Sequence, residues 1–142
     1  MRRSMVALLV IGLVSVPAVV SAGPPGDPFV GSWHAIDSVD GSNIWLRVGG
    51  GRHHAVYSED GLTACDNAFG EFVRGSASGF AVIDGDTMSL TATLYCNLST
   101  GRTAHPVLAP YTFVFEYDES TDTLTMTDPS LGVDETFTRS GG

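Results

Sequence analysis

Short segments in which apolar and polar residues alternate fill most of the chain after Phe29, and this pattern constrains the fold more than any other feature. Every second residue from Met88 to Cys96 is apolar, and in residues 111–118 aromatic side chains alternate with Thr, Val and Glu. Successive side chains of a β-strand point to opposite faces, so such a strand has one apolar and one polar face. The pattern predicts an antiparallel sheet with one face on a core and one in water.

Turn residues separate the predicted strands, and helical periodicity is nearly absent. The sequence Asp84-Gly85-Asp86 predicts a tight hairpin, because Asp-Gly suits the positive φ of such turns. The predicted strands cover residues 30–37, 43–48, 53–58, 62–65, 69–74, 78–83, 87–96, 111–118, 122–127 and 134–139, with a polar loop over 97–110. Short connections favour an all-β, antiparallel up-and-down meander of about eight strands, closed into a barrel without exposed edges. A β-sandwich is the alternative.

The first 22 residues have the pattern of a secretory signal peptide. Arg2 and Arg3 precede an apolar stretch from Met5 to Val16, which is too short to span a bilayer comfortably. Residues 23–28 form a Pro/Gly-rich linker, and residues 29–142 have the length of one domain. We therefore expect a secreted protein, extracellular or periplasmic, with a single β-barrel domain.

The chain has two cysteines, Cys65 and Cys96. In an exported protein the oxidising compartment favours a disulfide between them. Two free thiols are the alternative. A metal site is disfavoured because neither cysteine has a Cys or His neighbour at ligand spacing.

The protein is strongly acidic, with a formal net charge of −9, and all seven basic residues are arginines. Such a surface repels phosphate backbones, so we expect no nucleic-acid partner, and no membrane insertion after the leader is cleaved. His53 and His54 are adjacent on a predicted strand and therefore point to opposite faces. We expect no metal, no cofactor and no catalytic site. Asn97-Leu98-Ser99 matches a glycosylation sequon, which matters only in a eukaryotic secretory pathway.

Two terminal motifs carry a family resemblance. Gly31-Ser32-Trp33 opens the first predicted strand, and Glu135-Thr136-Phe137-Thr138-Arg139 closes the last one. With the intervening meander, this arrangement resembles the calycin superfamily, and most closely a bacterial lipocalin-like domain. The resemblance implies that Trp33 packs across the closed end of the barrel and that Arg139 covers the indole ring. Avidin-like proteins share both motifs, but biotin pockets use several further tryptophans, and here only Trp45 follows.

The remaining aromatic residues suggest a ligand site. The alternating side chains of residues 111–117 face inward in such a barrel, where they fill the core or line a pocket. The candidate ligand-binding residues are Trp45, Tyr57, Tyr111, Phe113, Phe115 and Tyr117. We expect a small, partly apolar ligand, which requires a cavity of at least a few hundred Å³. The alternative is a structural or protein-interaction module of the cell envelope without an internal ligand, and an enzyme ranks third.

Overall fold

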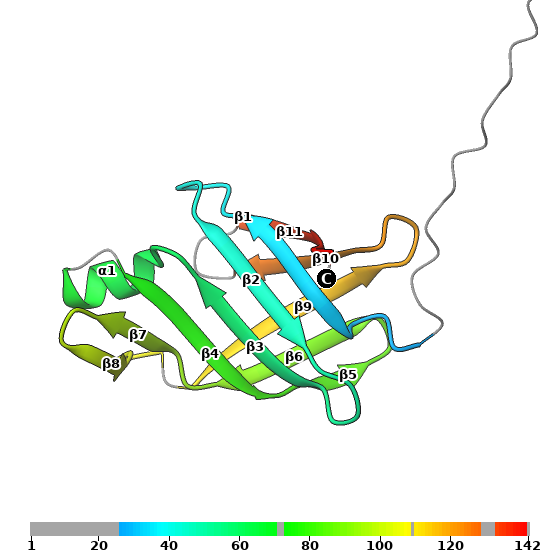
Figure 1. The fold of residues 1–142 in the computed structure, drawn as a ribbon, viewed down its shortest axis with the longest axis horizontal. Coiled ribbons are helices and arrows are strands. Elements are labelled where there is room, and N and C mark those ends of the chain that lie inside the picture. The colour runs from blue at the N-terminus through cyan, green and yellow to red at the C-terminus, as the bar shows by residue number, and fades with distance from the viewer. Residues whose placement is uncertain (1–25, 71–72, 109, 129–132, 142) are drawn as a thin grey trace, which may run out of the picture.

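The computed structural model describes residues 26–70, 73–108, 110–128 and 133–141. The predicted signal peptide, residues 1–22, lies outside these residues, as does half of the predicted linker. The described chain forms one antiparallel sheet that curls into a half-barrel, with one short helix at one end (Figure 1). The prediction of an all-β antiparallel fold is confirmed.

The sheet contains eleven strands, and α1 follows the third of them. The elements are β1 (Gly31–Ile36), β2 (Asn43–Val48), β3 (His54–Glu59), α1 (Thr63–Phe69), β4 (Arg74–Phe80), β5 (Val82–Asp84), β6 (Thr87–Ala92), β7 (Tyr95–Leu98), β8 (Gly101–Ala104), β9 (Tyr111–Asp118), β10 (Thr123–Asp128) and β11 (Val133–Arg139). Their order across the sheet is β5-β6-β9-β10-β11-β1-β2-β3-β4-β7-β8. The first and last strands of the described chain, β1 and β11, pair with each other inside the sheet.

The predicted barrel of about eight strands is wrong in two respects. The described residues form eleven strands, and the sheet does not close on itself, because no hydrogen-bonded ladder joins β4 to β6. The longest predicted strand, residues 87–96, is broken after Ala92. Its first half, β6, pairs with β9, whereas its second half, β7, crosses to pair with β4. The short strand β5 occupies the other edge of β6. β4 and β6 are nevertheless close at Gly79, where an added Cβ would lie 3.4 Å from the Leu90 side chain.

Other predictions fail where long-range packing decides the local structure. The segment predicted as strand 62–65 instead forms the N-cap and first turn of α1, in which Cys65 is buried and bridged to Cys96. Of the strand predicted over 69–74, Phe69 ends α1, Arg74 begins β4, and residues 71–72 lie outside the described residues. Gly75, which separates the strands predicted over 69–74 and 78–83, lies inside β4. The Leu62 side chain packs directly on Gly75 and leaves no room for a larger residue, because a Cβ at position 75 would lie 2.3 Å from it. The predicted polar loop 97–110 contains β8.

Where the alternation is clearest, the predictions are confirmed. The strands 43–48 and 111–118 have the predicted bounds, and β5 and β6 form the hairpin predicted at Asp84-Gly85-Asp86, with Gly85 at φ 59°. The inward faces of the strands form one core. Its fully buried large side chains include Trp33, Tyr57, Phe29, Phe115, Phe137, Met88 and Leu90.

Candidate functional site

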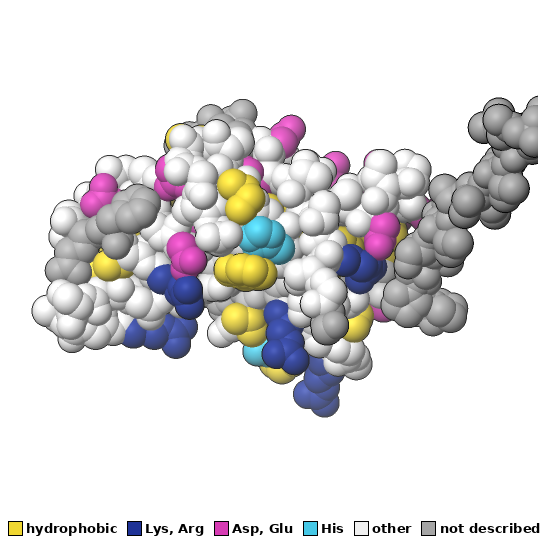
Figure 2. Space-filling model, turned by 45° about the horizontal axis from the view of Figure 1, so that its top comes forward, with side chains coloured by type: hydrophobic (Ala, Val, Ile, Leu, Met, Phe, Trp, Pro, Cys, Tyr) yellow, Lys and Arg dark blue, Asp and Glu magenta, His cyan; other side chains and the backbone are white. Residues whose placement is uncertain are grey.

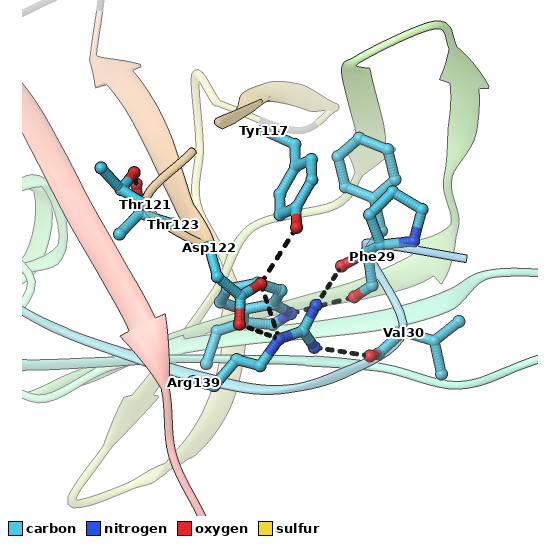
Figure 3. A network of polar contacts seen from close by, with 9 residues as sticks. Phe29, Val30, Tyr117, Thr121, Asp122, Thr123 and Arg139 are labelled. Carbon is cyan, nitrogen blue, oxygen red and sulfur yellow. Dashed lines mark hydrogen bonds and ion pairs between the residues drawn. The ribbon is translucent and has the colours of Figure 1, made fainter. Parts of the chain in front are cut away.

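Trp33 and Arg139 lie together at one end of the half-barrel, which we call the closed end. Figure 3 shows the polar contacts of Arg139 there with Asp122 and Val30. Trp33 is fully buried, and its indole Nε1 donates a hydrogen bond of 2.9 Å to the Phe29 carbonyl. The Arg139 guanidinium lies 4.1 Å from the centre of the indole ring, which is the arrangement that the resemblance implied. A cation over an indole face adds roughly 0.5–2 kcal/mol of attraction.

Arg139 also ties the chain before β1 to the end of β11. Its terminal nitrogens donate to the carbonyls of Val30 and Pro28, at 3.0 and 2.6 Å. Its Nε contacts both carboxylate oxygens of Asp122, which also accepts a hydrogen bond from the Tyr117 hydroxyl. Gly31, at φ +146°, leaves room for this network, because a Cβ there would lie 2.9 Å from the guanidinium. At this end the side chains of Trp33 and Phe29 are fully buried, and the partly exposed Arg139 and Asp122 lie over them.

The opposite end contains a cavity of about 160 Å³ that is partly open to solvent. The strand registers place it where β2, β9 and β11 begin and where β1, β3 and β10 end. This cavity is smaller than the few hundred Å³ expected for a pocket of this type. A dry cavity of about 150 Å³ can hold a benzene ring, so this one suits a ligand of single-ring size. Its walls include Ile44, Tyr57, Leu62, Ala64, Leu94, Leu108, Tyr111, Phe113 and Met126.

The helix α1 forms part of the rim and is fastened to the sheet at two points. The predicted disulfide between Cys65 and Cys96 is present and joins α1 to β7. Buried His105 contacts the Ala64 carbonyl through Nε2, and its Nδ1 accepts hydrogen bonds from the backbone N–H groups of Val107 and Leu108. With Nδ1 as an acceptor, Nε2 is the ring nitrogen that can donate to the Ala64 carbonyl. These contacts hold Ala64 and Leu108 at the cavity.

The polar side of the cavity contains a buried carboxyl group, Glu59, which is only 4% exposed. The Tyr57 hydroxyl donates a hydrogen bond to it. Burial raises the pKa of Glu59 to about 7; the bond from Tyr57 opposes this shift, and the neighbouring carboxylates of Asp37 and Asp40 reinforce it. The group therefore changes its charge close to neutral pH.

A second buried acid, Glu135, lies on the same cavity and is 5% exposed. Both of its oxygens accept hydrogen bonds from the Ser38 backbone N–H, and Oε1 also accepts one of 2.8 Å from the Ser38 hydroxyl. Glu135 therefore fixes the turn between β1 and β2 against β11. Its bonds also place the neighbouring Asp37 at the cavity.

The structure brings only half of the six predicted ligand-binding residues to the cavity. Tyr57, Tyr111 and Phe113 line it, and Phe113 contacts both tyrosine rings, with centroids 4.4 and 4.8 Å apart. Phe115 is fully buried against Phe137, and Tyr117 lies at the closed end beside Trp33. Trp45 is on the outer face, 42% exposed. The sequence reasoning missed Asp37, Glu59 and Glu135, although Glu59 continues the inward alternation of Ala55 and Tyr57.

The outer face of the sheet from β1 to β5 carries an exposed apolar stripe, which we define as Ile36, Trp45, Val56, Phe80 and Val82. The rings of His34 and Trp45 lie 4.2 Å apart, and those of His54 and Phe80 lie 5.4 Å apart. Arg47 is paired with Val56 across β2 and β3. Figure 2 shows hydrophobic, histidine and arginine side chains side by side on one face of an otherwise acidic protein.

Searches of protein-family models, curated proteins and solved structures gave no match to this chain. Within the part of the chain that the structure describes, no group of three metal-ligating side chains comes together. No helix among the described residues has the length and apolar character needed to cross a membrane. The fold and the cavity thus define an antiparallel half-barrel with one closed and one hollow end.

Glu59 predicts an unusual dependence of stability on pH. In the native state the Glu59 carboxyl group holds its proton up to about pH 7, whereas in the unfolded chain it releases the proton above pH 4.5. The contribution of this proton to the free energy of unfolding is therefore complete below pH 4.5 and is lost as the pH rises to about 7. The loss amounts to about 3 kcal/mol. Asp27 and Asp118 have lowered pKa values and titrate below this window. We expect denaturant titrations at several pH values to show this decrease in the free energy of unfolding for the wild type, and to show no such decrease for Glu59→Gln.

The matched control for this prediction is Glu116→Gln, on the exposed face of β9. The control variant should retain the decline of the wild type between about pH 4.5 and pH 7. If the free energy of unfolding of the wild type does not change over this pH range, or if that of Glu59→Gln falls as steeply as that of the wild type, Glu59 ionises at an ordinary pH.

Proposed function

We propose that this protein is a secreted, lipocalin-like binding protein that holds a small, partly apolar molecule in the cavity at the open end of the half-barrel. The observation that carries the proposal is the contrast between the two ends. Trp33, Arg139 and Phe29 fill one end, whereas the other retains about 160 Å³ beneath a fastened helix. Protein interiors are normally packed with few voids larger than a water molecule.

Two further observations support this proposal. Aliphatic and aromatic residues make up just over half of the residues that line the cavity, and threonine, asparagine and acidic side chains make up the rest. Small-molecule sites combine apolar walls with polar groups that orient the ligand. The disulfide is compatible with an extracellular or periplasmic location. The antiparallel half-barrel is also compatible with a calycin-like architecture, in which a ligand lies inside the sheet.

The test compares two tryptophan substitutions at neighbouring positions. Leu108 lines the cavity and packs on the core, whereas Val107 is 81% exposed and does not line it. We expect Leu108→Trp to place an indole ring in the cavity and abolish binding of single-ring compounds, such as benzyl alcohol. Val107→Trp should bind like the wild type. Native mass spectrometry with increasing ligand concentration measures ligand binding by the two variants.

A second candidate function is favoured by the apolar stripe on the outer face. Exposed apolar patches mark interaction sites, and the arginines beside this one suit an acidic protein partner. Such binding would not involve the cavity. If the wild-type protein binds none of the single-ring compounds, the apolar stripe becomes the favoured candidate for the binding site.

A further inference from the structure

The charged residues that line the cavity are all acidic. Asp37 follows β1, Glu59 ends β3 and Glu135 lies on β11, so three separate parts of the chain bring carboxyl groups to one cavity. Among the lining residues that the structure describes, none is Lys, Arg or His. A buried charge is costly unless a partner of opposite sign accompanies it. The cavity therefore disfavours an anion strongly and favours a cation.

Glu59 and Glu135 differ in how their charge is satisfied. Glu135 accepts three hydrogen bonds from Ser38, which stabilise its carboxylate within the protein. Glu59 is equally buried, receives the Tyr57 hydroxyl and is close to the negative charges of Asp37 and Asp40. Glu59 is thus the carboxyl group that would gain most from a positive charge placed in the cavity.

Aromatic rings stand beside this carboxyl group. Tyr57, which bonds to Glu59, is packed against Phe113 at 4.4 Å, and Tyr111 meets Phe113 edge-on at 4.8 Å. The faces of such rings attract cations, most strongly where water is excluded. A carboxylate and three aromatic rings around one cavity can hold an ammonium group together with a small apolar body. Ile44, Leu94 and Leu108 provide the apolar wall for that body.

We infer that the ligand of this cavity is a small organic cation, with an ammonium group at the Glu59 carboxylate and an apolar part of single-ring size among Tyr57, Phe113 and Leu108. This inference rests on the proposed function, because it names the chemical class of the ligand for the same cavity. Charge-assisted hydrogen bonds to a buried carboxylate are about twice as strong as neutral ones. The cationic group thus provides both affinity and selectivity.

Binding of a cation should also depend on pH. The titratable groups that face Glu59 are Asp37, Asp40 and Tyr57, with Glu135 and Tyr111 on the same cavity. A cationic ligand favours the ionised form of Glu59, so its affinity should rise as the pH increases from about 5 to about 7 and then level off. A neutral ligand of the same shape has no such preference for the ionised carboxyl group.

The experiment uses three probes of nearly the same shape: benzylamine, benzyl alcohol and benzoate. Isothermal titration calorimetry of the wild-type protein at about pH 8 should show benzylamine binding about tenfold more tightly than benzyl alcohol, and benzoate not binding. Glu59→Gln preserves the size of the side chain and an acceptor for Tyr57. It should remove the advantage of benzylamine, while benzyl alcohol binds as before. Glu116→Gln, on the exposed face of β9, is the matched control and should behave like the wild type.

The outcomes separate this inference from the proposed function. If benzyl alcohol binds as tightly as benzylamine, or if Glu59→Gln keeps the preference for benzylamine, the inference is wrong and the small-molecule site remains. If none of the three probes binds at millimolar concentration, both the inference and the proposed function are wrong. Retained binding of benzyl alcohol by Glu59→Gln shows that this variant is folded.

Discussion

Replacing Trp33 with alanine will lower the free energy of unfolding by about 3–5 kcal/mol. Trp33 is fully buried, so its removal leaves a cavity the size of an indole ring at the closed end. The substitution also removes the surface on which the Arg139 guanidinium lies and the hydrogen bond to the Phe29 carbonyl. Denaturant titration followed by circular dichroism measures the loss.

Trp45→Ala is the control for this substitution, because Trp45 is the other tryptophan of the chain and lies 42% exposed on the outer face. Its replacement should cost much less, since no core cavity forms. If the two variants lose the same stability, or if Trp33→Ala changes it by less than about 1 kcal/mol, Trp33 does not close the half-barrel.

The second large effect is expected from the disulfide. Its cysteines are 31 residues apart in the chain, and the chain-entropy model assigns about 3–4 kcal/mol to a loop of this length. Replacing both Cys65 and Cys96 with alanine should lower the free energy of unfolding by this amount. The same change frees α1 from β7, so amide exchange should increase in Thr63–Phe69.

Treatment of the wild type with a reductant should reproduce this loss, and the double variant should not respond to the reductant. The intact mass of the wild type should be two hydrogens below the fully reduced value. Free thiols in protein from an oxidising compartment, or a double variant as stable as the wild type, would contradict the assignment of the bridge.

The strands could be predicted where a single residue pattern decides them. The alternation in 111–118 and the Asp84-Gly85-Asp86 turn are local signals, and the structure follows both. The break after Ala92 has no comparable signal, because it depends on which neighbour each half of the strand joins. Helix α1 likewise depends on contacts with distant residues, the bridge to Cys96 and the packing of Leu62 on Gly75.

The candidate site was predictable only in its aromatic part. Inward alternation placed Tyr57, Tyr111 and Phe113 correctly in the interior, but it could not tell which end of the interior is hollow. The same alternation continues to Glu59, where an acidic residue beside Asp60 and Gly61 has the composition of an ordinary turn. The sequence alone does not show that Glu59 shares a cavity with Asp37 and Glu135, because these residues come from distant parts of the chain.

The central claim is that the hollow end of the half-barrel, and not the outer stripe, binds a small molecule. Native mass spectra of the wild type, Leu108→Trp and Val107→Trp with benzyl alcohol test it most directly. We expect a one-to-one adduct with the wild type and with Val107→Trp, released on unfolding, and none with Leu108→Trp. An adduct of equal intensity in all three proteins, or none in the wild type, would contradict it.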